Sequence, residues 1–169
     1  HVVWPPTELT HALLFSSGPA SYVLNVPIPY GVHGVYTMTL WAKYTSDYNG
    51  DNVMVNTDWW TVPSANNAGF LGSTQAGWPQ QPDIWEHIYV EFDSGNFAPT
   101  NMRWYVGKRG NSGTLGSIFV SDLSVSGPKG VIYMFCNFAN GSHPVNYDAT
   151  LSTAISSYSI VSFQVNNEV

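Results

Sequence analysis

The chain has 169 residues, of which 44% are hydrophobic, so it is long and apolar enough to fold around one full core, which excludes general disorder. Only 9% of the residues are charged, well below the roughly 25% typical of soluble proteins, and the net charge is −6 with five Lys and Arg in total. This balance excludes a nucleic-acid binder, which needs cations for the phosphates, and no apolar run is long enough for insertion into a membrane.

Short segments in which apolar and polar residues alternate, separated by turns rich in Gly, Pro and Asn, predict β-strands along the whole chain. No segment keeps the 3.6-residue period of a helix. Many short strands of this kind predict an all-β fold, either a sandwich or a barrel. The strands are expected at His11–Ser16, Tyr22–Val26, Val35–Tyr44, Asn52–Asp58, Ile84–Asp93, Asn101–Gly107, Ser117–Val125, Val131–Asn137 and Ser159–Val165.

Two regions stand outside this regular pattern. The segment Pro63–Pro82 has no strand period and carries Phe70, Trp78 and three prolines, so we expect a long functional loop that folds over one face. The tail after residue 127 adds two strands and a Ser/Thr-rich stretch, and we expect it to form a sheet edge or an oligomer contact. The whole chain, residues 1–169, is interpreted as one β-sandwich domain with a C-terminal extension over residues 128–169.

Two expected strands, in residues 84–93 and 101–107, carry ring and polar side chains on the face opposite to their apolar side chains. Aromatic rings stack on the apolar face of a sugar, and the neighbouring polar groups hydrogen-bond to its hydroxyls. The pattern predicts a glycan-binding sheet face, unless a second sheet or the long loop covers these residues and makes them core. The candidate binding residues of the two strands are Trp85, His87, Tyr89, Arg103 and Tyr105.

Three more tryptophans are candidates for the same site. Trp41 alternates with the apolar residues of its strand, so we expect it on the face of Trp85 and Tyr105. Trp59 and Trp60 point to opposite faces because they are adjacent, and we expect Trp60 and Trp78 to be exposed at the rim of the site.

Three sequence segments resemble one family when they are read in order. A strand ending in an aromatic and a lysine, Val35–Lys43, is followed by a strand opened by a tryptophan, Trp85–Phe92, and by a closing strand with an aspartate near its end, Gly116–Val125. This order resembles the jelly-roll carbohydrate-binding modules of the galactose-binding-like superfamily, over about residues 11–127. Similar modules occur in extracellular polysaccharide-degrading enzymes and in phage or viral tail fibres and spikes. The resemblance implies a two-sheet antiparallel β-sandwich.

The same resemblance implies a structural calcium between the first and closing strands, with Asp122 as its ligand. The apolar parity also changes near Ser121 and Asp122, which predicts a β-bulge. Ser121 stands where the family has a first acidic residue, and Glu8 is the acidic residue near the first strand. The alternative is that Asp122 hydrogen-bonds to the backbone at the bulge.

Other chemistry has weaker support in the sequence. Glu86, Glu91, Asp93 and Asp58 are the carboxylates available for glycosidic cleavage, but their pattern suits a solvated sheet equally well. Cys136 is the only cysteine and lies among large apolar residues, so we expect a buried, unreactive thiol.

The sequence therefore predicts non-catalytic recognition of a glycan or cell-surface polysaccharide, by an accessory module or a viral fibre head. The alternatives are a structural or homo-oligomerisation domain of a fibre or extracellular protein and, with less support, a small polysaccharide-degrading enzyme. The sparsely charged polar surface favours a location outside the cell or on a virion.

Overall fold

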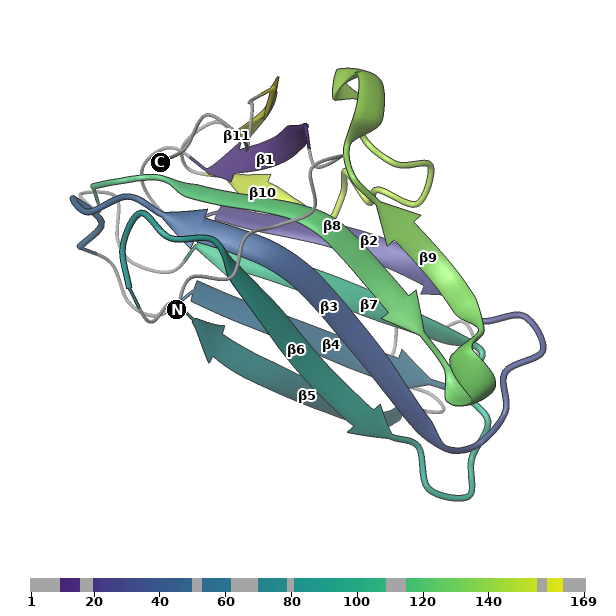
Figure 1. Cartoon of the computed structure of the whole chain (residues 1–169). Coiled ribbons are helices and arrows are strands. Elements are labelled where there is room, and N and C mark those ends of the chain that lie inside the picture. The colour runs from purple at the N-terminus through teal and green to yellow at the C-terminus, as the bar shows by residue number, and fades with distance from the viewer. Residues whose placement is uncertain are drawn as a thin grey trace.

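The computed structural model of the chain consists of two β-sheets packed face to face (Figure 1). Within the described residues the helical segments are the short 3-10 turns η1 (Pro128–Gly130) and η2 (Ala139–Gly141), and none of them could span a membrane. The structure describes residues 10–15, 20–49, 53–61, 70–78, 81–108, 115–154 and 158–162. The strands are β1 (His11–Phe15), β2 (Ala20–Pro27), β3 (Val35–Tyr44), β4 (Val53–Trp60), β5 (Phe70–Trp78), β6 (Glu86–Asp93), β7 (Asn101–Lys108), β8 (Ile118–Ser126), β9 (Ile132–Cys136), β10 (Thr153–Ala154) and β11 (Tyr158–Ser162).

The strand order defines a jelly roll. Sheet A has the order β11-β1-β8-β3-β6, with β9 also paired to β8, and sheet B has the order β10-β2-β7-β4-β5. Every pairing is antiparallel. The first eight strands divide into β1, β3, β6 and β8 in one sheet and β2, β4, β5 and β7 in the other, which is the jelly-roll distribution. The predicted all-β, two-sheet antiparallel β-sandwich is confirmed.

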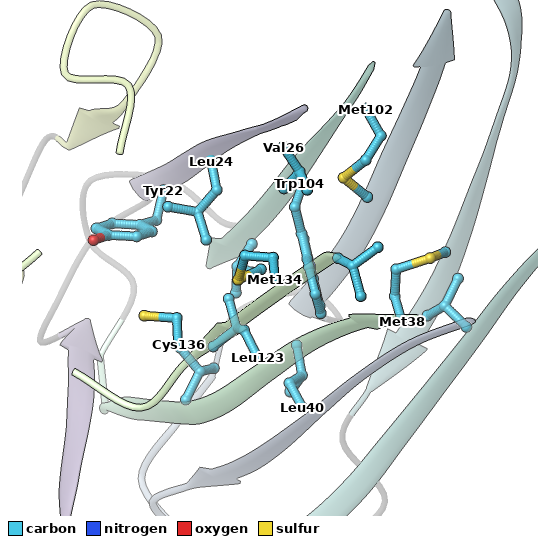
Figure 2. Packing of buried hydrophobic residues seen from close by; sticks show 14 of the residues in the cluster. Tyr22, Leu24, Val26, Met38, Leu40, Met102, Trp104, Leu123, Met134 and Cys136 are labelled. Atoms are coloured by element: carbon cyan, nitrogen blue, oxygen red, sulfur yellow. The ribbon is translucent and has the colours of Figure 1, made fainter. Parts of the chain in front are cut away.

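The core lies between the inner faces of the two sheets. Alternate side chains of β3, such as Met38 and Leu40, are almost fully buried, and they meet Met102 and Trp104 from β7 (Figure 2). Cys136 also belongs to this core, and burial raises the pKa of its thiol to about 11. The prediction of a buried cysteine is confirmed.

A β-bulge interrupts the pairing of β3 with β8. Thr39 pairs with Ser124 and Trp41 pairs with Ser121, so two steps along β3 match three along β8. Asp122 has a φ of 51° within this irregularity, a value that aspartate tolerates better than most residues. The bulge that the change of apolar parity predicted is therefore confirmed.

The expected loop over residues 63–82 is wrong in its second half. Residues 70–78 form strand β5 at the edge of sheet B and pair along the whole length of β4. The segment contains Gly72, Ser73 and Gly77, and it lacks the apolar alternation by which a strand is recognised. Its pairing with β4 compensates for this weak local propensity.

The C-terminal residues add strands to both sheets. Strand β9 pairs with the second half of β8, β10 pairs with β2, and β11 pairs with β1. The ring of Tyr147 stacks on His143 at 4.3 Å and on Tyr22 at 4.8 Å, while the Tyr22 hydroxyl hydrogen-bonds to His143 Nδ1 at 2.6 Å. These contacts hold the tail against β2, and the expectation that the tail adds a sheet edge is confirmed. The division of the chain at residue 128 stays a prediction.

Candidate functional site

The structure separates the predicted binding residues into two groups on opposite sides of the sandwich. Strands β3 and β6 lie in sheet A, whereas β4 and β7 lie in sheet B, so one shared aromatic face is wrong. Period-two alternation tells the outer face of a strand from its inner face, but it does not tell which sheet the strand joins. On sheet A the residues are Trp41, His87 and Tyr89, and Trp85, which precedes β6, packs with Trp41. On sheet B they are Trp60, Arg103 and Tyr105.

The two indoles of sheet A are covered by their neighbours. Trp41 is 7% exposed, and the imidazole of His87 stacks on it at 4.7 Å with an interplanar angle of 14°. Trp85 is 3% exposed, and Lys43 Nζ lies 5.2 Å from its ring centre. Partial burial lowers the pKa of His87, so its ring stays neutral to lower pH. The expectation of open stacking surfaces at Trp41 and Trp85 is therefore wrong.

Tyr89 and Trp78 are the other two candidates. Tyr89 is 57% exposed on the outer face of sheet A, and its hydroxyl donates a hydrogen bond to Glu91 Oε1 at 2.7 Å. Trp78 is the last residue of β5, and its side chain lies outside the described part of the chain.

The outer face of sheet B carries a row of polar side chains across four strands. Asn25 on β2 pairs with Arg103 on β7, Arg103 pairs with Asp58 on β4, and Asp58 pairs with Ser73 on β5. Residues paired in this way point to the same side of a sheet. The row continues into the tail, where Asp148 Oδ2 accepts a 2.6 Å hydrogen bond from Asn25 Nδ2.

An aromatic row runs beside the polar row. Asn101 on β7 pairs with Trp60 on β4, and Trp60 pairs with Phe70 on β5. Phe70 is 46% exposed, while Trp60 is 2% exposed and lies 5.6 Å from Phe70 between ring centres. The guanidinium carbon of Arg103 lies 4.9 Å above the Trp60 ring, so Arg103 joins the two rows.

The charged groups of these rows interact. Arg103 Nη1 donates a 3.4 Å hydrogen bond to the Tyr105 hydroxyl. Partial burial raises the pKa of Asp58, although a hydrogen bond with Tyr105 and the positive charge of Arg103 act in the opposite direction. The sheet-B site, by which we mean Asp58, Trp60, Phe70, Arg103 and Tyr105, is therefore an arrangement of polar groups held in place beside an exposed ring.

Sequence reasoning found part of this site. Trp60, Arg103 and Tyr105 were predicted as ligand contacts, and the structure brings these three together. Asp58 was considered for catalysis alone, because its pairing with Arg103 is a long-range contact between strands. Phe70 was assigned to a loop, and recognising β5 is the signal that would have placed it in the site.

The carboxylates considered for glycosidic cleavage do not converge. Glu86, Glu91 and Asp93 lie on β6 in sheet A, whereas Asp58 lies on β4 in sheet B. Glu91 and Asp93 are exposed neighbours on one face. A glycosidase needs two carboxyl groups on either side of the scissile bond, and Asp58 lies on the other sheet from the three carboxylates of β6.

Asp122 lies in the bulge of β8, where the calcium was expected. Ser121 Oγ donates a 2.5 Å hydrogen bond to the carbonyl of His11, so this hydroxyl joins β8 to β1. Among the residues that the structure describes, no three His, Cys, Asp or Glu side chains form a metal-binding group. Glu8 lies outside those residues, and the calcium expected at Asp122 stays a prediction.

No protein-family model matches the chain, and no curated protein matches it. Several solved structures are similar in fold. The structure described as family 16 carbohydrate-binding module-2 has a TM-score of 0.46 and 12% identity, over 68% of this chain and 74% of that one. The structure of TmCBM61 in complex with β-1,4-galactotriose has a TM-score of 0.40 and 15% identity, over 68% of each chain.

A phage protein has a similar fold. The enzymatically active domain of bacteriophage CBA120 tailspike protein 4 has a TM-score of 0.49 and 9% identity, and the match covers 68% of this chain but 15% of that one. At these identities the likeness concerns the fold alone. The chain is a jelly-roll β-sandwich by its own strand order.

Proposed function

We propose that the protein is a non-catalytic glycan-recognition domain that binds its ligand on the outer face of sheet B. The observation that carries this proposal is the polar row of Asp58 and Arg103 beside the aromatic row of Trp60 and Phe70. Saccharide rings present hydroxyls at their edges and C–H groups on their faces, so they need both kinds of contact side by side.

Each group of the sheet-B site has a role in this proposal. Phe70 offers an exposed ring for stacking, and the covered ring of Trp60 supports the Arg103 guanidinium from below. Arg103 donates hydrogen bonds, Asp58 accepts them, and the Tyr105 hydroxyl does both. Because these side chains already contact each other, little conformational entropy is lost when a ligand binds.

The setting that fits this function is an accessory module or a viral fibre head outside the cell. The support is compositional, because a surface built from Ser, Thr, Asn, Gly and Gln with 9% charged residues suits an extracellular or virion protein. The scarcity of Lys and Arg favours neutral glycans over strongly anionic ones.

The experiment is a binding screen of the full chain against immobilised neutral and acidic polysaccharides, with two variants. Arg103→Ala removes the guanidinium, and Phe70→Ala removes the exposed ring. Phe97→Ala is the matched control, because Phe97 is 60% exposed and follows β6, outside the site. We expect both site variants to lose at least about tenfold in affinity while the control binds as wild type does. Unchanged affinity in both site variants, or no binding by the wild-type chain, would overturn the proposal.

A further inference from the structure

The outer face of sheet A carries a second pattern, away from Trp41 and Trp85. Thr39 on β3 pairs with Tyr89 on one side and with Ser124 on the other, and Ser124 pairs with Phe135 on β9. One row across four strands therefore reads Phe135, Ser124, Thr39 and Tyr89. Neighbouring strands are about 4.8 Å apart, so β9 and β6, which carry the two rings, lie roughly 14 Å from each other across the sheet.

The next row along the same strands repeats the pattern. Thr37 pairs with Glu91 and with Ser126, and Ser126 pairs with Ile132. Ile132 is 66% exposed, and Glu91 is exposed at the other end of the row. The two rows place four small hydroxyl side chains between larger side chains on β9 and β6. We call these four, Thr37, Thr39, Ser124 and Ser126, the hydroxyl face.

Among the described residues, the hydroxyl face makes no side-chain hydrogen bonds that hold the fold together. Other hydroxyls of this protein do have such a role, because Ser121 Oγ bonds to His11 and Ser94 Oγ bonds to the carbonyl of Gly34. The four hydroxyls are half-buried, so their hydrogen-bonding capacity is turned toward whatever lies on this face.

The two aromatic side chains that flank the hydroxyl face, those of Phe135 and Tyr89, are exposed. Phe135 is 58% exposed and Tyr89 is 57% exposed, although both belong to a sheet that has a large core to fill. The Tyr89 hydroxyl is oriented by its bond to Glu91. The acidic groups near this row are Glu91 and Asp93, while Lys129 lies in the turn between β8 and β9 and Lys43 lies farther along β3 over the rings of Trp85 and Phe119.

We infer that the hydroxyl face and its flanking rings form a second glycan-contacting surface, which takes a neutral polysaccharide lying across the strands. The rings of Phe135 and Tyr89 stack on two sugars of the chain, and the hydroxyl face exchanges hydrogen bonds with the sugars between them. The carboxylates accept bonds from sugar hydroxyls and repel uronate or sulfate groups. The inference rests on the proposed function only in taking the ligand to be a glycan, because it uses none of the residues of the sheet-B site.

Two glycan-contacting surfaces on opposite sides of the sandwich should strengthen binding to a polymer. When one surface holds a polysaccharide, the other is presented to further chains at a high effective concentration. The expected result is a larger affinity for insoluble or cross-linked glycan than for a short soluble oligosaccharide.

The test uses affinity electrophoresis of the full chain in gels that contain β-1,4-galactan, xylan or glucomannan, with polygalacturonate as the anionic comparison. Tyr89→Ala/Phe135→Ala removes the two rings, and Thr39→Val/Ser124→Ala removes two hydroxyls at nearly constant volume. Phe97→Ala is again the control for an exposed ring. Circular dichroism and the melting temperature of each variant establish that it is folded.

We expect the ring variant to bind at least one neutral polysaccharide about tenfold more weakly, the hydroxyl variant to weaken it several-fold, and the control to match the wild type. Adding Arg103→Ala to the ring variant should weaken binding further. Wild-type affinity in both sheet-A variants would overturn the inference and leave the sheet-B proposal intact. If Arg103→Ala and Phe70→Ala both bind normally while the ring variant does not, the sheet-B proposal fails and this inference stands.

Sedimentation of the same proteins supplies an independent outcome. A wild-type dimer that becomes a monomer in Tyr89→Ala/Phe135→Ala would show that a second copy of the chain covers this face, and it would overturn the inference. Binding of none of the polysaccharides by the wild-type chain would overturn both proposals.

Discussion

Arg103→Ala is expected to destabilise the fold by an amount that depends on Asp58. In the native protein the Arg103 guanidinium lies 4.9 Å above the Trp60 ring and its charge lowers the pKa of Asp58, which burial raises. Because burial raises that pKa, ionising Asp58 costs folding free energy as the pH rises through it, and Arg103 offsets part of this cost. Removing the Arg103 charge therefore raises the free energy of the folded protein when Asp58 is ionised, and this effect is absent when Asp58 is protonated.

The magnitude follows from two contacts. A partly exposed cation–π contact is worth about 0.5–1 kcal/mol, and the attraction between two partly exposed opposite charges, here Arg103 and Asp58, is worth up to about 1 kcal/mol. Arg103→Ala should then cost about 1–2 kcal/mol at neutral pH. In an Asp58→Asn background the charge attraction is already absent, and the cost should fall to about 0.5–1 kcal/mol.

The assay is urea denaturation of the wild type, both single variants and the double variant, followed by tryptophan fluorescence at neutral pH and again near pH 3. The cost of Arg103→Ala should be larger in the wild-type background than in the Asp58→Asn background at neutral pH. This difference should shrink in acid, where Asp58 is protonated. Equal costs of Arg103→Ala in the two backgrounds, within about 0.3 kcal/mol, would refute the coupling on which the sheet-B site is built.

Three other predictions concern the fold. Asp148→Ala should cost about 1 kcal/mol of unfolding free energy, because the carboxylate accepts hydrogen bonds from Thr150 and Asn25. These bonds lower its pKa to about 2, so the difference in unfolding free energy between variant and wild type in urea titrations should be lost as the pH falls from 4 through 2. A pH-independent difference would contradict this. Cys136 should react with a thiol reagent at neutral pH at least about 100-fold more slowly in the native protein than in urea, because its thiol is buried; equal rates would contradict this. Gly116→Ala should cost at least about 2 kcal/mol in thermal unfolding, because the φ of Gly116 is 90° and a Cβ there would collide with the backbone of Tyr48. An unchanged melting temperature would contradict this.

The sequence was sufficient for those parts of the fold that depend on local pattern. Strand β3 was predicted with its observed ends, and the parity change near Asp122 predicted the bulge, because both follow from which side chains face the core. Strand β5 was missed because its Gly and Ser residues carry no alternation, and β10 was missed because two residues are too few for a pattern. Strand β5 exists through its pairing with the preceding strand β4, and β10 exists through its pairing with β2, which is distant in sequence.

The candidate sites show the same division. Arg103 and Tyr105 were identified because they alternate with buried residues on one strand, which is a local property. Their placement on a different sheet from Tyr89 was not predictable, because strand order is set by contacts across the whole chain. Phe135 was placed in a strand, but its row with Tyr89 appears only when β9 is seen to pair with β8.

The most direct test of glycan recognition on sheet B is an NMR titration with the polysaccharide fragment that binds best in the screen. The Trp60 indole N–H and the Arg103 side-chain N–H signals should shift together with saturable binding, because the ligand is expected to contact Arg103 above that ring. The indole N–H signals of Trp59 and Trp104, which are fully buried on the inner face of the same sheet, should move much less. Saturable binding that leaves the Trp60 and Arg103 signals unmoved would contradict the proposal.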